Sequence, residues 1–151
     1  MKQRQRGVTL IELLTVMVVI AIIASIAIPS YRRYLLRAQR TDARTALLQL
    51  QTAEEKFLLQ NNTYTSNITA GTGGTPPGLG LTAASEKGFY TLRVTLQTVN
   101  NAPGYLLTAV PAAVVGGQRD DTDCAQFTLD EQGQRAALNS SGADNTAVCW
   151  K

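Results

Sequence analysis

The sequence predicts an α+β protein, in which one long N-terminal helix precedes a small antiparallel sheet of about four strands. Two changes in the pattern of apolar residues support this prediction. An unbroken apolar run gives way to apolar residues at three- and four-residue steps, as on one face of a helix. Farther along, apolar and polar residues alternate, as they do in half-buried strands. A chain of 151 residues suits one such helix and one modest domain.

The predicted helix runs from about Thr9 to Gln60. Its first part, residues 8–29, contains an apolar stretch that reaches roughly 31 Å, enough to cross a bilayer core of about 30 Å. Pro29 closes this stretch and predicts a kink, because proline removes one backbone hydrogen bond. Residues 30–60 continue the helix with one apolar stripe, and two asparagines then provide a stop signal.

The rest of the chain predicts a loop and a sheet. Gly, Thr, Ser, Asn and Pro dominate the segment after the helix, which therefore reads as a long loop rather than a packed element. Hairpin neighbours then imply an antiparallel meander, whose apolar face the striped part of the helix can cover. The predicted segments are the loop 61–88 and the sheet region 89–151, with strands at 89–98 and 105–112, a turn at 100–104, and two more strands within 124–138.

Charge is unevenly distributed along the chain. The formal net charge is +3, and three basic residues lie in segment 1–7, ahead of the apolar run. Five arginines face one aspartate in segment 30–44, whereas segment 45–151 holds six basic and nine acidic side chains. The C-terminal domain is therefore mildly acidic and lacks the broad basic surface of a generic nucleic-acid binder.

Residues for catalysis or metal binding are scarce. The chain has no histidine, no nucleophile elbow and no phosphate-binding loop of the glycine-lysine type, so we expect no enzyme and no cofactor. Asp120, Asp121 and Asp123 carry oxygen ligands suited to Ca²⁺, but their spacing is not that of an EF-hand. A solvated acidic turn is the expectation there, with no metal bound.

The two cysteines leave two alternatives open. Cys124 and Cys149 both lie near the C-terminus. They are expected to form one disulfide if the domain is exported to an oxidising compartment, and to remain free thiols in a reducing one.

The N-terminal segment has two possible interpretations as an export signal. An ordinary secretory signal would be cut before Ile28, but the apolar core is longer than usual and contains Glu12. The stretch RGVTLIEL instead resembles the cleavage motif of type IV pilins, with Gly7 before the cut and Val8 as the new N-terminus. Pro29 matches the helix-kinking proline of that family, and valine stands at the position that is usually phenylalanine.

This resemblance implies a type IV pilin fold, cleavage by a prepilin peptidase and N-methylation of Val8. It also implies a single membrane pass in a Gram-negative inner membrane, with the domain in the periplasm, and then a place in an extracellular pilus. The implied partners are other pilin subunits, the inner-membrane assembly machinery and, before assembly, membrane lipid. Glu12 would pair with the Val8 amine of a neighbouring chain and set the register; the alternative is a protonated glutamate satisfied within its own helix.

The C-terminal domain resembles PilE-like and ComP-like minor pilins. The stretch RTDARTALLQLQTAEEKFLLQNNTYT and the segments GFYTL, GYLLTAVP and DCAQFTLDEQGQRAAL carry this likeness, with a poor match at residues 66–88. A minor pilin that supports pilus assembly, adhesion or motility is therefore expected. The alternatives are a ComP-like DNA-uptake receptor and a type II secretion pseudopilin.

DNA contact, if present, would fall on a limited set of basic residues. The five arginines of segment 30–44 are expected instead to meet lipid headgroups or acidic groups on neighbouring subunits. The candidate contacts in the C-terminal domain are Lys87, Arg93, Arg119, Arg135 and Lys151.

Overall fold

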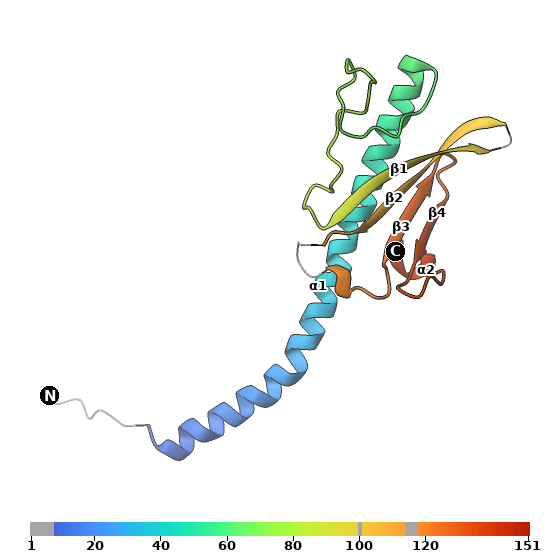
Figure 1. Cartoon of the computed structure of the whole chain (residues 1–151). Coiled ribbons are helices and arrows are strands. Elements are labelled where there is room, and N and C mark those ends of the chain that lie inside the picture. The colour runs from blue at the N-terminus through green and yellow to red at the C-terminus, as the bar shows by residue number, and fades with distance from the viewer. Residues whose placement is uncertain (1–7, 100, 114–117) are drawn as a thin grey trace. The chain divides into compact units, whose positions relative to one another are not determined.

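A computed structural model describes residues 8–99, 101–113 and 118–151. It confirms the α+β class, with one long helix followed by a four-stranded antiparallel sheet (Figure 1). The chain divides into two compact units between Leu35 and Leu36. We call residues 8–35 the N-terminal arm and residues 36–151 the head.

Helix α1, Leu10–Asn61, has a defined start and end. Thr9 caps the start, because its Oγ1 accepts the backbone N–H of Glu12 at 3.3 Å. At the other end Asn62 adopts a left-handed φ of 55°, and its N–H bonds the carbonyl of Leu58. The helix therefore extends one residue beyond the predicted Gln60, and the asparagine pair terminates it as expected.

The sheet is a meander in the order β1-β2-β3-β4. Strand β1, Tyr90–Val99, pairs along its whole length with β2, Ala102–Pro111. The ladder reaches Ala102, so the predicted turn at 100–104 is too long; Asn101 has a left-handed φ of 63° that lets the chain reverse earlier. The shorter elements are β3, Gln126–Asp130; β4, Arg135–Leu138; the 3-10 turn η1, Gln118–Asp120; and α2, Thr146–Cys149.

One face of the sheet and one stripe of α1 form the core of the head. Leu92 and Val94 are buried on the inner face, as the alternation predicted, whereas Leu96 farther along the same strand is exposed. Leu107 of β2 is buried as well. Leu47 and Leu50 of α1 are buried in the same cluster. The helix stripe therefore covers the sheet, which burial of both apolar surfaces favours.

The loop between α1 and β1 packs more closely than its composition suggested. Ile68 and Leu79 are buried in the core, although the segment was expected to be a loop without packing. Leu79 donates its N–H to the carbonyl of Asn67, which ties two parts of the loop together. A Cβ at Gly78 would lie 2.5 Å from that same carbonyl, so this close approach requires glycine.

Carboxylates of α1 anchor both ends of this loop. Glu54 is fully buried, and one of its oxygens accepts the N–H of Thr65 at 3.2 Å, while the other has no partner. Its loss of hydration raises its pKa to about 7, an effect that the Thr65 N–H partly offsets. At the far end of the loop, Asp42 accepts hydrogen bonds from the Ser85 hydroxyl and the Lys87 N–H.

Candidate functional site

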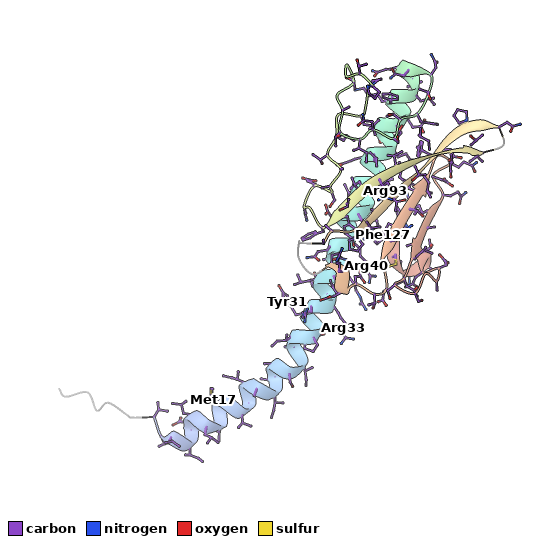
Figure 2. The ribbon with its side chains drawn as sticks, in the orientation of Figure 1. Met17, Tyr31, Arg33, Arg40, Arg93 and Phe127 are labelled. Carbon is purple, nitrogen blue, oxygen red and sulfur yellow. A yellow bond between two sulfur atoms is a disulfide. The ribbon has the colours of Figure 1, made fainter. Side chains whose placement is uncertain are left out.

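The N-terminal arm exposes apolar side chains over most of its length. Between Val8 and Ile28 every large apolar side chain keeps 51–83% of its surface exposed (Figure 2). By length and composition α1 is able to cross a membrane, with a mean hydropathy of 2.8 in its most apolar window. So large an apolar surface is unfavourable in water. The arm therefore needs lipid or other protein chains around it.

Glu12 lies in the first turn of α1. Its backbone N–H bonds Thr9, so the two residues fit the Thr-x-x-Glu pattern of a helix start, and a carboxylate is favourable near that positive helix end. Its side chain is exposed, and no partner of its carboxylate lies among the described residues. The register role of Glu12 remains a prediction, as does the alternative of a protonated glutamate satisfied within its own helix.

The remaining residues of the N-terminal motif give less structural information. Gly7 lies outside the described residues, and Val8 is exposed just ahead of α1. Pro29 lies inside α1, which is assigned as helix on both sides of it. The kink at Pro29 remains a prediction.

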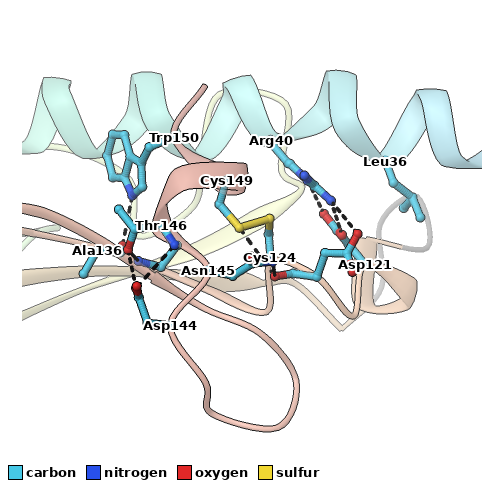
Figure 3. The surroundings of a disulfide bond; sticks show 12 residues. Leu36, Arg40, Asp121, Cys124, Ala136, Asp144, Asn145, Thr146, Cys149 and Trp150 are labelled. Carbon is cyan, nitrogen blue, oxygen red and sulfur yellow. Dashed lines mark hydrogen bonds and ion pairs between the residues drawn. A yellow bond between two sulfur atoms is a disulfide. The ribbon is translucent and has the colours of Figure 1, made fainter.

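In the head, Arg40 of α1 forms a buried ion pair with Asp121. Arg40 Nε and Nη2 donate to the two carboxylate oxygens of Asp121 at 2.7 Å each (Figure 3). These hydrogen bonds raise the pKa of Arg40, whereas burial opposes the charged form. Asp123 adds a longer contact of 3.6 Å, and the Gln118 amide donates to the Tyr90 hydroxyl and to Asp121. The network ties the segment after β2 to the helix.

Two sequence expectations are corrected by this pair. Asp121 was expected in a solvated acidic turn, but only 4% of its surface is exposed. Arg40 was expected to meet lipid or a neighbouring subunit, but it is satisfied inside its own chain. The sequence separation of 81 residues hides this contact, because nothing local marks the two residues as partners. Among the described residues no group of three or more His, Cys, Asp or Glu side chains is placed to hold a metal ion.

Cys124 and Cys149 form a disulfide, which decides between the two alternatives for the thiols. Both residues are buried, and the bond joins the segment before β3 to α2 (Figure 3). Trp150 follows directly, packs edge-on against Phe127 and donates its indole N–H to the Ala136 carbonyl at 2.9 Å. The C-terminal end of the chain is thus fixed to the sheet.

A basic pocket lies between α1 and this C-terminal segment. Its volume is about 390 Å³. Three of its lining residues, Arg37, Arg40 and Arg44, come from one face of α1, because they follow each other at three- and four-residue steps. The lining is completed by Val148, Cys149 and Lys151. The spacing of the three arginines could be seen in the sequence, but the contribution of the C-terminal residues to the pocket could not.

The five candidate DNA contacts do not line one common pocket. Lys151 lines the basic pocket, whereas none of the other four does. Arg93 lies exposed on β1 (Figure 2), and Arg135 on β4 stacks 5.2 Å above the Trp150 ring. Lys87 precedes β1 and Arg119 lies in η1. Lys87, Arg93, Arg119 and Arg135 therefore lie in four separate segments of the head.

Comparison with known proteins places the chain in a family. Residues 2–28 match the prokaryotic N-terminal methylation motif. Residues 29–128, well over half of the chain, match the family described as "Type IV minor pilin ComP, DNA uptake sequence receptor". The chain belongs to this type IV pilin family. Membership of a minor-pilin family favours the pilin interpretation over a secretion pseudopilin.

Several relatives support the assignment to the pilins. The type IV major fimbrial protein FimA of Dichelobacter nodosus is 40% identical over 82 residues, which cover 49% of this pilin and 53% of FimA. The type IV major pilin protein PilA of Myxococcus xanthus is 41% identical over 61 residues, 40% of this chain and 28% of PilA. PilE1 of Neisseria gonorrhoeae, also a type IV major pilin, is 31% identical over 96 residues, 64% of this chain and 42% of PilE1. The pilin thus spans about half or less of the length of these relatives.

Proposed function

We propose that this pilin is a minor subunit of a type IV pilus and assembles through its N-terminal arm. The observation that carries the proposal is the arm itself, whose large apolar side chains between Val8 and Ile28 are all at least half exposed. Such a surface is suited first to lipid and then to the arms of other subunits. The head brings its own core and needs no partner to bury it.

The proposed route begins with cleavage by a prepilin peptidase between Gly7 and Val8, followed by N-methylation of Val8. The match to the methylation motif supports this step. The processed pilin waits in the inner membrane of a Gram-negative cell, with its head in the periplasm, until the assembly machinery adds it to the pilus. There it contributes to assembly, adhesion or motility.

Glu12 is proposed to set the register of assembly. Its carboxylate has no partner among the described residues, and the new amine of Val8 on a neighbouring chain is the matching cation. In the apolar interior of a filament, loss of one member of such a pair costs about 3–5 kcal/mol. An unpaired subunit would therefore be incorporated poorly.

The test is to count the pilin in sheared pili relative to the amount in membranes, in cells whose own copy is deleted. We expect Glu12→Ala to lower this ratio at least tenfold. Glu86→Ala is the matched control, because Glu86 is also exposed and its carboxylate has no partner within the described part of the chain. Normal incorporation of Glu12→Ala would contradict the register role, and absence of the wild-type pilin from pili would contradict the proposed function.

Reception of DNA is the second candidate function, favoured by the family description "DNA uptake sequence receptor". The exposed side chains of Arg93 and Arg119 are the proposed phosphate contacts, with Lys87, Arg135 and Lys151 in support. The full chain in nonionic detergent would be titrated with a labelled DNA duplex at two salt concentrations. We expect weaker binding in Arg93→Gln and Arg119→Gln but not in Lys56→Gln. Equal binding by all three variants would exclude these contacts.

A further inference from the structure

The basic pocket has an excess of positive charge that the head does not neutralise. Four of its six lining residues are cationic. Within residues 8–99, 101–113 and 118–151, only Arg40 among them has carboxylate partners, Asp121 and Asp123. Counting side chains alone, the four cations and these two carboxylates leave two positive charges.

The side chains that carry this excess lack anionic partners. Arg37 and Lys151 are exposed, and neither makes a side-chain hydrogen bond or ion pair within the described residues. Arg44 Nη2 donates to the neutral Thr41 hydroxyl at 3.0 Å. Its Nε is buried without any acceptor. Arg44 lines the pocket and has the neutral Thr41 hydroxyl as its only hydrogen-bond partner among the described residues, so the charge of its guanidinium is left for an anion in the pocket.

The walls of the pocket are fixed by the fold. Arg37 and Arg44 are seven residues apart on one helix, which puts them two turns or about 10 Å apart on the same face. The opposite wall contains Cys149, which the disulfide holds in place close to Arg40 (Figure 3). The fold therefore holds the backbone of the lining residues, and binding has to order only the exposed side chains of Arg37 and Lys151, which limits its entropic cost.

We propose that this pocket binds a phosphate group. A phosphate offers several acceptor oxygens and up to two negative charges, which match the charge excess of the side chains and the presence of three cations, Arg37, Arg44 and Lys151, around one pocket. Arginine in particular forms paired hydrogen bonds with phosphate oxygens. A single carboxylate has one charge and two oxygens, and it leaves one of these cations without a partner.

Two sources can supply this chemistry, a soluble phosphate compound or the headgroup of an anionic phospholipid. The pocket belongs entirely to the head, so the proposal does not depend on filament formation. Binding of either source adds an acceptor for Arg44 and stabilises the folded head.

The first experiment measures thermal unfolding of the full chain in nonionic detergent, followed by the fluorescence of its single tryptophan, Trp150. Inorganic phosphate is titrated against sodium chloride and sodium acetate of equal ionic strength. We expect saturable stabilisation by phosphate alone. The double variant Arg44→Gln/Lys151→Gln should weaken apparent phosphate binding at least tenfold. The control Lys56→Glu lowers the net charge by the same two units, at an exposed residue outside the pocket, and should bind phosphate as the wild type does.

The second experiment distinguishes the sources. The same three proteins are placed in phosphatidylcholine nanodiscs that contain one tenth phosphatidylglycerol, and enrichment of phosphatidylglycerol beside each protein is measured by native mass spectrometry. Enrichment that the pocket variant loses and the control keeps supports the lipid headgroup. Phosphate binding without such enrichment supports a soluble source. Absence of both effects, equal stabilisation by acetate, or equal loss in the pocket variant and the Lys56→Glu control would overturn the proposal.

Discussion

The N-terminal arm and the head differ in what can bury their apolar surface: the head buries its own, whereas the arm leaves its large apolar side chains exposed. In the head, helix residues such as Leu47 and Leu50 are buried against the sheet of the same chain. In the arm, side chains such as Met17 and Ile20 stay exposed although they belong to the same helix. The stability of the head is therefore intramolecular, whereas the favourable burial of the arm is available only with lipid or other subunits.

The charged residues Arg40 and Asp121 of the head and Glu12 of the arm differ in the same way. Arg40 and Asp121 are buried in the head and satisfy each other. Glu12, the acidic residue of the arm, has no partner in the described part of the chain. The effects of substitutions in the two regions should consequently be measured differently. The free energy of unfolding is the measure for the head, and the amount of the pilin incorporated into pili is the measure for the arm. Trp150 reports on the head alone, because it is the single tryptophan.

The largest effect on unfolding is expected from breaking the buried ion pair. Arg40→Ala leaves Asp121 buried without its cation, which should lower the free energy of unfolding by about 3–5 kcal/mol. Urea unfolding followed by Trp150 fluorescence measures this. The double variant Arg40→Met/Asp121→Leu removes both charges and should recover most of the loss. A loss below about 1 kcal/mol for Arg40→Ala would mean that the pair does not hold the head together.

The disulfide should rank next. Cys124→Ser/Cys149→Ser opens a loop with a sequence separation of 25 and should lower the free energy of unfolding by about 3 kcal/mol, because the unfolded chain gains freedom. The same urea measurement on the wild type with and without dithiothreitol gives an independent value. If the reduced wild type and the serine variant differ in stability, the substitution itself has disturbed packing.

Glu54 should make the stability of the head depend on pH. Its pKa is about 7 in the folded head against an ordinary 4.5, so the folded protein holds the proton more tightly than the unfolded chain. Its contribution is fully present below about pH 4.5 and is lost as the pH rises to about 7, with a total of about 1–3 kcal/mol. Glu54→Gln should remove this decline and be more stable than the wild type at pH 8.

The matched control for this comparison is Glu86→Gln, which removes an exposed carboxylate from the same head. Its unfolding free energy should follow that of the wild type at each pH. A wild-type decline that survives in Glu54→Gln would assign the pH dependence to another group.

The smallest effect on unfolding is expected in the arm. Ile20→Ser replaces a side chain that is 55% exposed and belongs to the other unit, so the unfolding free energy of the head should change by less than about 0.5 kcal/mol. The amount of the pilin in sheared pili should nevertheless fall. A clear loss of head stability in this variant would show that the two regions are coupled and would break the comparison.

Much of the fold was predictable because it depends on local patterns. The alternation around Leu92 and Val94 predicted the first strand and its buried face, and the asparagine pair predicted the end of α1. The start of β2 was placed too late because the left-handed conformation of Asn101, which shortens the turn, is one that asparagine adopts only in some contexts. Burial of Ile68 depended on tertiary packing that composition does not reveal.

The functional residues also divide into those that a local sequence pattern reveals and those that only the tertiary fold brings together. The N-terminal motif around Glu12 is contiguous and was recognisable from the sequence. The Arg40–Asp121 pair and the basic pocket join segments from opposite ends of the head, so only the fold brings them together. The spacing of Arg37 and Arg44 indicated that they share one face of the helix. Nothing in the sequence indicated that Lys151 lies near them.

The covalent ring closed by Cys124 and Cys149 also limits how far the head can stretch under tension. The disulfide spans a sequence separation of 25, which corresponds to about 80 Å of extended chain that pulling cannot release. The ring contains β3, β4 and all of α2. In a subunit pulled by its two ends, the chain inside the ring therefore adds nothing to the extension, even where segments outside the ring unfold.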